Sequence, residues 1–542
     1  MSRRTARTST PAKGKPTRNG GPTRPDAGGR TPVGGLRDAQ RPGTSRRTPG
    51  ARSRGQPSAL ARTWVGRVPR AAWVCALVGF LNAACWSIVS PPFENPDEPA
   101  HFAYVQRLAQ TGELPKSSRE LFPPAESTVL NDLHYAQVRF HSEQGTIAGE
   151  AEQRTLESDL AKPLALSDEE GATGVSASQP PLYYALEIVP YALASGNMLG
   201  QVALMRLLSA VMGGLTALFA YLFLREALPT NRWAWAVGGL GVALAPLLAQ
   251  MSGAINPDAL LFAVSTALFY CLARGFRRGI TPRLATATGA VLAIGVSTKL
   301  TFVGLVPGAL LGVFILCARE ARRSRPNAWR CLGLALGVGA IPVVLYGLVN
   351  LLSGDPLGGV FAGVLASERP GGSLFGELSY IWQFYLPPLP GMSPVFHGLS
   401  TTQVFWFNGL VGLYGWLDAP FPEWVYNVAL IPAAVLAVLL AGALIRERRV
   451  LPARVGELAV YATTSLGLLL LIGADDYVHQ LPGEYAEPRY VLPLIALWGA
   501  ALALAARGVG RRWAPVAGVA IVCLALAHDI FSGLLVVSRY YG

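Results

Sequence analysis

The 542-residue sequence predicts an all-α protein that crosses a membrane about 11 times (range about 11 to 13), on three observations. The chain is 51% hydrophobic and has a mean hydropathy of +0.35, which is above the range of ordinary soluble proteins. Several apolar runs reach the roughly 20 residues that a helix needs to cross the hydrocarbon. Short segments between many of these runs are rich in arginine, as is typical of cytoplasmic loops.

Residues 1–70 form a basic segment whose composition differs from that of the rest of the chain. They hold 17 Lys and Arg against 2 Asp, whereas the remainder holds 29 basic and 31 acidic residues. The segment has almost no large apolar residue, so it cannot bury a core and is predicted to be disordered. Such a tail can contact anionic lipid or nucleic acid. A solvated cytoplasmic tail that fixes the orientation of the spans is favoured, and no nucleic-acid partner is expected.

A transmembrane domain is predicted over residues 71–540, and its first span runs from about Ala71 to Ser90. A long acidic segment follows, and it ends in a shorter apolar stretch at 182–199 that contains Glu187 and Pro190. Ten further spans are predicted at roughly 202–224, 233–252, 258–274, 284–300, 302–318, 331–352, 426–445, 455–473, 490–506 and 513–537.

The charges of the short linkers decide how the stretch 182–199 is interpreted. Five linkers, at 225–232, 274–283, 319–330, 446–454 and 507–512, together hold 18 Arg and 3 Glu. If 182–199 does not span, all five fall on the same side as the basic tail, and if it spans, all five move to the other side. The stretch is therefore predicted to be an interfacial or re-entrant helix, with Tyr183 and Tyr184 at the level of the lipid headgroups.

This orientation places the loops 91–201, 353–425 and 474–489 together on the outer face of the membrane. Arginine outnumbers lysine 41 to 5, which is typical of a GC-rich bacterial genome. The predicted location is the bacterial inner membrane, with multiple spans, a cytoplasmic N-terminus and extracytoplasmic outer loops.

An acidic cluster follows directly on the first span, where prolines 91, 92, 96 and 99 stop the helix and hold the chain extended. Its adjacent carboxylates, Asp97 and Glu98, are candidates for a base and for a group that orients a ligand or a metal. A helix from Ala100 onward would bring Asp97, His101 and Tyr104 onto one face, with Glu94 nearby. The competing interpretation is that these are solvated acids of an acidic outer loop.

Three further features place charge at the outer face. Lys299 lies in a very short turn between two apolar stretches, where it suits the phosphate of an anionic lipid but also fits an interfacial lysine. Arg489 begins a span on the side where arginine is rare, which suits phosphate recognition or an ion pair with Glu484 or Glu487. Asp258, in Asn256-Pro257-Asp258, either binds a ligand or caps the next helix.

Metal-binding residue types also gather at the outer face, although their spacing is not a metal signature. Asp475, Asp476 and His479 fall in the last outer loop, and His528 and Asp529 fall near the outer half of the last span. Carboxylate oxygens and imidazole could together hold a hard cation.

Several motifs, taken in order, resemble the membrane-embedded GT-C glycosyltransferases that take sugars from polyprenyl-phosphate carriers. The resemblance is to the branch of lipid A aminoarabinose transferases and protein O-mannosyltransferases, and to uncharacterised bacterial predicted membrane proteins beside them. The motifs are Asn95-Pro96-Asp97-Glu98-x-x-His101-Phe102, Gln179-Pro180-Pro181-Leu182-Tyr183-Tyr184, Asn256-Pro257-Asp258, Ser297-Thr298-Lys299 and Glu487-Pro488-Arg489-Tyr490-Val491-Leu492-Pro493. The family usually has lysine, or another residue, before its Pro-Pro-Leu, and here that position is Gln179.

The resemblance implies a GT-C-like fold and a role for each motif. Asp97 would be the general base on the acceptor, and Glu98 would support it or hold a divalent cation, the one cofactor implied, together with His479. Lys299 and Arg489 would bind the phosphate of the donor, which leaves in the reaction. The implied substrate-binding residues are Glu94, His101, Tyr104, Tyr183, Tyr184 and Asp258.

The resulting hypothesis is a membrane glycosyltransferase that works on the extracytoplasmic face. It would transfer a sugar from a polyprenyl-phosphate donor to a glycan, lipid or protein acceptor of the cell envelope, by inverting displacement. The alternatives are a transporter or flippase of lipid-linked saccharides, which would need polar residues deep inside several spans, and a non-catalytic scaffold of envelope assembly.

Overall fold

A computed structural model describes residues 68–115, 120–143, 149–161, 172–324, 327–353, 373–396, 400–478 and 487–542. These residues are mostly helical and include two short antiparallel strand pairs. Strand β1 (Glu120–Leu121) pairs with β2 (Ala172–Thr173), and β3 (Leu413–Tyr414) pairs with β4 (Ala419–Pro420). The predicted all-α membrane fold is therefore confirmed, while the basic tail lies outside the described residues except for its last three positions.

Eight described helical segments are long and apolar enough to cross a membrane. They are α1 (Arg70–Val89), α7 (Met198–Ala227), α10 (Asp258–Arg278), η4 with α12 (Leu300–Leu305 and Val306–Arg322), α18 (Glu423–Glu447), η6 with α19 (Leu451–Arg454 and Val455–Val478), η7 with α20 (Pro488–Leu494 and Ile495–Gly508) and α21 (Ala514–Tyr541).

Two bent helix pairs raise that number to ten if each pair is one span. Helices α8 (Arg232–Ala243) and α9 (Pro246–Ser252) bend by 58°, and α13 (Ala328–Gly339) and α14 (Ile341–Ser353) bend by 42°. Each bend coincides with a proline, Pro246 or Pro342, that begins or nearly begins the second helix. The eleventh expected span is α11 (Pro282–Thr298), which at 17 residues is shorter than the others.

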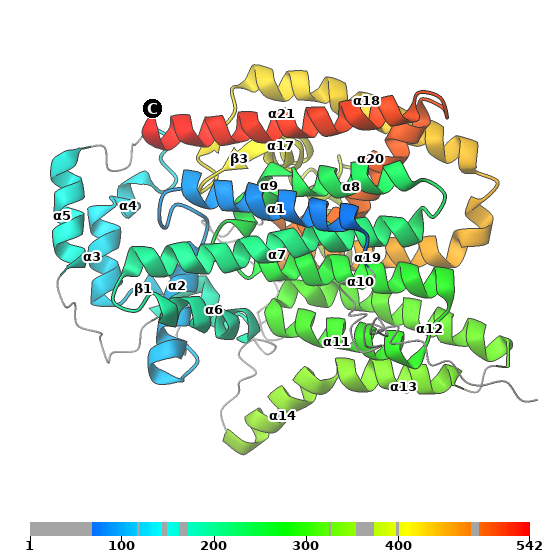
Figure 1. The fold of residues 1–542 in the computed structure, drawn as a ribbon, viewed down its shortest axis with the longest axis horizontal. Helices are drawn as coiled ribbons and strands as arrows, with labels where there is room; N and C mark the ends of the chain where they lie inside the picture. Colours follow the sequence, from blue (N-terminus) through cyan, green and yellow to red (C-terminus); the bar gives the residue numbers. More distant parts are fainter. Residues whose placement is uncertain are drawn as a thin grey trace, which may run out of the picture. The chain divides into compact units, whose positions relative to one another are not determined.

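The segment between α1 and α7 folds into short helices at the end of the bundle where α1 stops and α7 starts (Figure 1). They are α2 (Glu98–Thr111), α3 (Pro124–Asp132), α4 (Tyr135–Val138), α5 (Glu150–Leu160), η3 (Gly174–Ser178) and α6 (Leu182–Leu193). Helix α6 packs between α2 and α7 and has only 12 residues. At about 1.5 Å per residue it is too short to cross the hydrocarbon, in agreement with the interfacial or re-entrant helix that the linker charges predict.

A hairpin from the segment between α14 and α18 lies along the C-terminal half of α19. Its first arm is α16 (Leu374–Tyr385), in which Tyr380 bonds Asp476 and Tyr385 bonds the carbonyl of Leu469, so the two helices run antiparallel. Its second arm is the π-helix η5 (Ser400–Asn408), where Trp406 donates to the carbonyl of Phe384. The short helix α17 (Gly409–Gly412) then returns the chain to the site described below.

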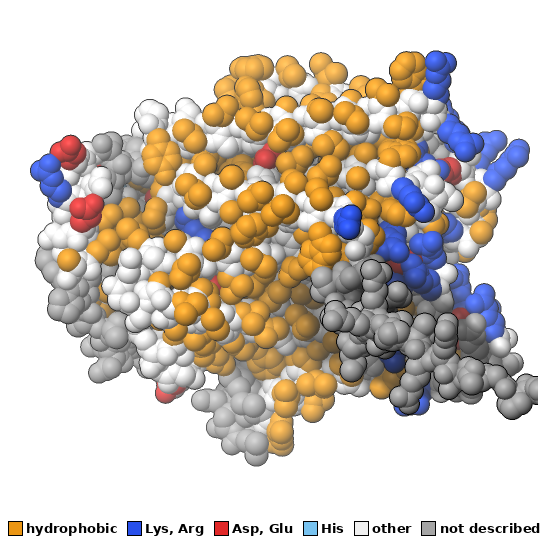
Figure 2. Space-filling model, in the orientation of Figure 1, with side chains coloured by type: hydrophobic (Ala, Val, Ile, Leu, Met, Phe, Trp, Pro, Cys, Tyr) orange, Lys and Arg blue, Asp and Glu red, His pale blue; other side chains and the backbone are white. Residues whose placement is uncertain are grey.

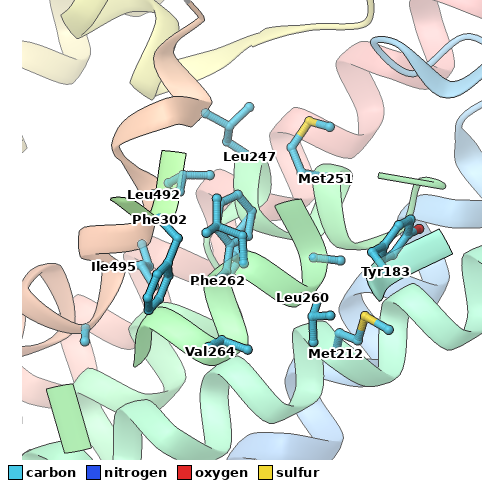
Figure 3. Close-up of a cluster of buried hydrophobic side chains, with 14 of the residues drawn as sticks. Tyr183, Met212, Leu247, Met251, Leu260, Phe262, Val264, Phe302, Leu492 and Ile495 are labelled. Atoms are coloured by element: carbon cyan, nitrogen blue, oxygen red, sulfur yellow. The ribbon is translucent and has the colours of Figure 1, made fainter. Parts of the chain in front are cut away.

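The centre of the bundle is α7, which packs lengthwise against α1 on one side and α10 on another. Small residues allow the close approach: a Cβ on Gly214 would lie 2.8 Å from the carbonyl oxygen of Ala76 in α1. Figure 3 shows apolar side chains from several elements converging beside α10. They are Tyr183, Met212, Leu247, Met251, Leu260, Phe262, Val264, Phe302, Leu492 and Ile495.

Most of the Lys and Arg side chains visible in Figure 2 gather at the end of the bundle opposite α2–α6. Contacts join the linkers there: Arg277 donates to the carbonyl of Arg225, Arg319 lies over the ring of Phe276, and Arg446 donates to the carbonyl of Gly508. The arginine-rich linkers thus share one end of the molecule, as their charges predict. We call it the basic end.

Candidate active site

Arg206 in α7 fixes the start of the acidic segment to the end of α1. Its guanidinium donates to the carbonyl oxygens of Ser87 and Ser90 at 2.8 and 2.7 Å, and to that of Pro91 at 2.7 Å. The last carbonyls of a helix have no intrahelical donor and carry partial negative charge. A buried arginine supplies both hydrogen-bond donors and a compensating positive charge. Arg206 of α7 therefore caps the C-terminus of α1 and fixes the start of the segment that carries Asp97.

Glu98 is the carboxylate that holds Arg206 in place. It is fully buried, and its oxygens lie 2.7 and 2.6 Å from Nε and Nη2 of Arg206. They also accept the backbone N–H groups of Phe93 and Ile255, each at 3.0 Å. Because its two oxygens already accept four hydrogen bonds, this geometry favours a structural role for Glu98 over proton transfer or metal binding. Its expected roles as catalytic support and metal ligand remain predictions.

Asp97 projects beyond this ion pair into a second group of charges. It occupies the N-cap position of α2 in the left-handed conformation, with φ of 63°. That conformation is uncommon for a residue other than glycine and turns the side chain away from Glu98. Adjacent carboxylates are thereby separated, one bonded to Arg206 and the other to Arg489.

Five charged residues from four distant segments meet there, and we call them the charged cluster: Asp97, Asp258, Lys299, Glu487 and Arg489. Nη2 of Arg489 lies 2.5 Å from Asp97 and 2.8 Å from Glu487, and its Nε lies 3.5 Å from Asp258. Nζ of Lys299 lies 2.6 Å from the other oxygen of Asp258. The structure thus brings together Asp97, Asp258, Lys299 and Arg489, all of which sequence reasoning had selected.

Breaks between helices place these side chains. Asp258 is the first residue of α10, and its backbone N–H bonds the side chain of Asn256, whose amide in turn reaches the carbonyl of Pro96. Lys299 is an extended residue between α11 and η4, and Arg489 lies in the first turn of η7. The aromatic ring of Tyr490 lies under both cations, 5.2 Å from Nζ of Lys299 and 5.5 Å from Cζ of Arg489.

Burial and charge act in opposite directions on the acids of the cluster. Burial raises the pKa of Asp97 and is the largest single effect, but the charge and hydrogen bond of Arg489 together with the charge of Lys299 oppose it, and the pKa falls below its usual value. Burial raises the pKa of Glu487 to about 7, against the opposing charge of Arg489 and with support from the charge of Asp97. At neutral pH Asp97 is therefore ionised, while Glu487 is near its midpoint.

Access to the cluster is narrow. Arg489 is 1% exposed, whereas the side chain of Asp97 is 21% exposed. A pocket of about 10 Å³ opens beside Arg489, which is room for about one water molecule. It is lined by Pro96, Leu247, Gln250, Met251, Gly409, Leu413, Gly415, Leu417, Glu487, Pro488 and Arg489.

His101 and the tyrosines adjoin the cluster through a separate polar chain. Nδ1 of His101 lies 2.9 Å from the hydroxyl of Tyr184, whose ring stacks on that of Tyr104 at 3.6 Å. Burial lowers the pKa of His101 to about 3, so this imidazole is neutral at physiological pH. Tyr183 points elsewhere, with its hydroxyl 2.8 Å from that of Ser209, which donates to Glu187.

Glu94 lies apart from the charged cluster. It is buried, and its electrostatic neighbours are Asp418 and Arg539, which bond each other at 3.1 Å, together with Glu98 and Arg206. Burial and the charge of Asp418 raise the pKa of Glu94 to about 8. Because none of these neighbours belongs to the charged cluster, the location of Glu94 favours a structural position behind the loop over contact with an anionic donor.

The metal-binding residue types do not assemble among the described residues, where no group of three or more His, Cys, Asp and Glu side chains is arranged to hold an ion. His479 lies outside the described residues. His528 bonds the carbonyl of Val411, and Asp529 accepts from the indole of Trp86.

Arg206 and Glu487 are residues of the candidate site whose importance the sequence does not fully reveal. A lone arginine inside the apolar run of α7 is a signal in itself, because an uncompensated charge there is costly. Its partner Glu98 was already a candidate residue. Nothing in the sequence could pair them, since they are 108 positions apart.

Comparison with known proteins identifies a family and similar solved structures. A family model described as "Predicted membrane protein (DUF2142)" matches residues 80–498. No curated protein sequence matches the chain.

The structure of ArnT from Cupriavidus metallidurans bound to undecaprenyl phosphate is similar, with a TM-score of 0.44 and 15% identity, covering 85% of this chain and 64% of that one. Its apo structure gives a TM-score of 0.43 and 14% identity, covering 80% and 59%. The chain thus spans less than two thirds of the length of ArnT.

Proposed function

This chain belongs to the family of predicted membrane proteins designated DUF2142, and from that premise we propose that it is a GT-C-type membrane glycosyltransferase. It transfers a sugar from a polyprenyl-phosphate donor to a glycan, lipid or protein acceptor of the cell envelope. One observation carries the proposal: two buried cations, Lys299 and Arg489, lie beside the ionised carboxylate of Asp97 at one end of a transmembrane bundle. Displacing an anomeric phosphate requires both a base and positive charge on the leaving group.

The proposed reaction is a single inverting displacement. The acceptor hydroxyl oxygen forms a bond to the anomeric carbon while the bond from that carbon to the phosphate oxygen breaks. Asp97 takes the hydroxyl proton, and the polyprenyl phosphate leaves with the electron pair, which Lys299 and Arg489 stabilise. No oxidant or further reactant is needed.

Donor binding and base activation are coupled through Arg489 in this proposal. In this proposal the arriving phosphate takes Nη2 of Arg489, which is bonded to Asp97 and Glu487 in the structure, and so replaces at least one of these carboxylates. An arginine that turns to the phosphate releases Asp97, whose pKa then rises because its main stabilising charge has gained another partner. Asp97 becomes a stronger base when the donor is present.

The neighbouring residues would act as supports. Asp258 would hold Lys299, and His101, fixed by Tyr184 and Tyr104, would line the acceptor side of Asp97. We place Tyr183 and Glu94 behind the site, where they would not contact the substrate and would act only by positioning other residues. A divalent cation at Glu98 does not fit the four donors that already occupy its oxygens.

The active face is proposed to be extracytoplasmic, in the bacterial inner membrane. The charged cluster lies at the start of α10, the end of α11 and the start of η7, which are the helix ends away from the arginine-rich linkers. Arginine-rich loops favour the cytoplasm.

The proposal is tested with undecaprenyl phosphate as the probe and Asp97→Asn and Arg489→Gln as variants. Full-length protein in detergent should bind the probe, and Arg489→Gln should weaken that binding by roughly a hundredfold, because a buried charge-assisted contact is lost. An Arg511→Gln control at the basic end should bind as the wild type does.

The activity arm of the test compares the envelope glycans of cells that produce each protein in place of the native one. Asp97→Asn should bind the probe and yet give the glycan composition of a deletion strain. A wild-type composition from Asp97→Asn would overturn the catalytic role and favour a transporter or a scaffold.

A further inference from the structure

A cavity of about 510 Å³ lies at the basic end, far along the bundle from the charged cluster. It is formed by the last turns of α7 and α10, the first turns of α11, and the residue that precedes α1 by two positions. The lining residues are Val68, Leu222, Arg225, Glu226, Tyr270, Cys271, Arg274, Arg278, Thr281, Arg283, Leu284 and Ala287.

A buried carboxylate organises the arginines of this cavity. Glu226, whose side chain is 2% exposed, lies 2.6 Å from Nη2 of Arg278, 3.0 Å from Nη1 of Arg277 and 3.4 Å from Nη1 of Arg274. Arg274 also reaches the hydroxyl of Tyr270, and Arg277 also donates to the carbonyl of Arg225. The three guanidinium groups are thus held in fixed positions before any ligand arrives.

The cavity carries an excess of positive charge. Four arginines line it, and Glu226 is the one carboxylate among the described residues of its wall. Arg225 and Arg283 line the cavity but form no ion pair with a carboxylate within the described part of the chain. The side chains of Arg274 and Arg278 are 38% and 43% exposed, so they keep N–H donors available to a ligand.

The remaining wall is apolar and belongs to the spans themselves. Its apolar residues lie in α7, α10 and α11, farther into the bundle than the arginines: Leu222, Cys271, Leu284 and Ala287. A ligand that satisfies both parts of the wall has an anionic head and a hydrocarbon body. A basic tail segment of this chain would instead be repelled by the arginines.

We propose that this cavity binds the phosphate group of an anionic phospholipid from the adjacent leaflet, with its acyl chain against the apolar wall. Planar guanidinium groups match phosphate oxygens in pairs, and basic pockets between spans are suited to lipid head groups. The site is independent of the proposed transferase reaction, since it lies at the other end of the bundle and shares no residue with the charged cluster.

The test titrates full-length protein in detergent with phosphatidylglycerol, phosphatidylcholine or inorganic phosphate, and counts bound lipid by native mass spectrometry. The double variant Arg225→Gln/Arg283→Gln removes two cavity charges without touching the ion pairs of Glu226. A matched control, Arg448→Gln/Arg511→Gln, removes two exposed charges from the same end outside the cavity. A third variant, Arg489→Gln, separates this site from the charged cluster.

Phosphatidylglycerol should bind more tightly than phosphatidylcholine, and the cavity variant should weaken it by roughly thirtyfold, since each basic residue near a lipid surface contributes about a fivefold factor. The control and Arg489→Gln should bind it as the wild type does. Equal binding of the two lipids, equal loss in the matched control, or displacement of the lipid by inorganic phosphate at similar concentration would each overturn the proposal.

Discussion

At the scale of single residues, the site depends on one arginine that serves three carboxylates. Arg489 is 1% exposed and bonds Asp97 and Glu487 while approaching Asp258. Removing a buried cation leaves its carboxylates uncompensated, which is more damaging than the net contribution of the pairs suggests. Lysine at this position would keep the charge but lose the planar guanidinium, whose several N–H groups can bond more than one carboxylate at once.

Arg489→Lys should therefore fold and yet bind undecaprenyl phosphate more weakly than the wild type, by roughly tenfold or more. Arg489→Gln should show a larger loss, together with a lower melting temperature. The check is probe binding and thermal unfolding in the same detergent. Wild-type affinity in Arg489→Lys would mean that the planar geometry of the guanidinium plays no part.

Glu487 gives the site a pH dependence. Its pKa in the folded protein, about 7, is raised above the ordinary value of 4.5, so the folded state holds a proton that the unfolded chain loses first. Stability from this group is present at low pH and falls as the pH rises from about 4.5 to 7. Protonation also removes a negative charge from beside the proposed phosphate position.

Affinity for undecaprenyl phosphate should accordingly fall as the pH rises through about 7 in the wild type, relative to Glu487→Gln at each pH. The variant is the reference because a phosphate monoester itself ionises near pH 6. The measurement is a pair of binding titrations from pH 5.5 to 8.5. Parallel curves for the two proteins would exclude Glu487 as the titrating group.

At the scale of elements, the position of Asp97 follows from how α1 ends and α2 begins. The buried pair of Arg206 and Glu98 joins the C-terminal carbonyls of α1 to the first residue of α2 and to the backbone of Ile255. A left-handed Asp97 then points the catalytic candidate away from this pair. In the proposed mechanism the pair is structural, and its effect on catalysis would be indirect.

Glu98→Gln should lower the unfolding free energy by about 3–5 kcal/mol, because Arg206 keeps its charge in a buried place without a counterion. The matched control is Glu113→Gln, which removes an exposed ion pair with Arg107 and should change little. Thermal unfolding in detergent measures both. A melting temperature of Glu98→Gln equal to that of the control would show that α1 does not depend on this contact.

At the scale of the whole molecule, the basic end and the charged cluster lie at opposite ends of the bundle, which fixes how the chain would sit in a membrane. Single cysteines test the orientation: Thr230→Cys lies at the basic end and Thr111→Cys at the other, in a protein otherwise free of cysteine. A membrane-impermeant maleimide should label Thr111→Cys in intact cells and Thr230→Cys only after permeabilisation. The reverse pattern would place the cluster in the cytoplasm.

Sequence alone predicted much of this arrangement because long apolar runs and loop charges are local signals. The bundle, the short helix α6 and the common end of the arginine-rich linkers follow from them. Sequence could also select Asp97, Asp258, Lys299 and Arg489 as unusual charges at one face.

The sequence could not predict which carboxylate pairs with which arginine. Glu98 and Asp97 are neighbours with the same chemistry, and only the left-handed turn at Asp97 assigns one to Arg206 and the other to Arg489. Glu94 was expected beside them as a substrate-binding residue, but its neighbours in the structure are Asp418 and Arg539. Such choices depend on contacts across more than a hundred residues.

The small size of the pocket beside Arg489 bears on fidelity. A carrier-linked sugar is open to attack by any hydroxyl, including that of water, and hydrolysis would waste the donor. In the proposed reaction, space for about one water molecule beside Arg489 leaves few competing nucleophiles near the leaving phosphate. A chain that opens this pocket only for its donor would favour transfer over hydrolysis before any specific recognition of the acceptor.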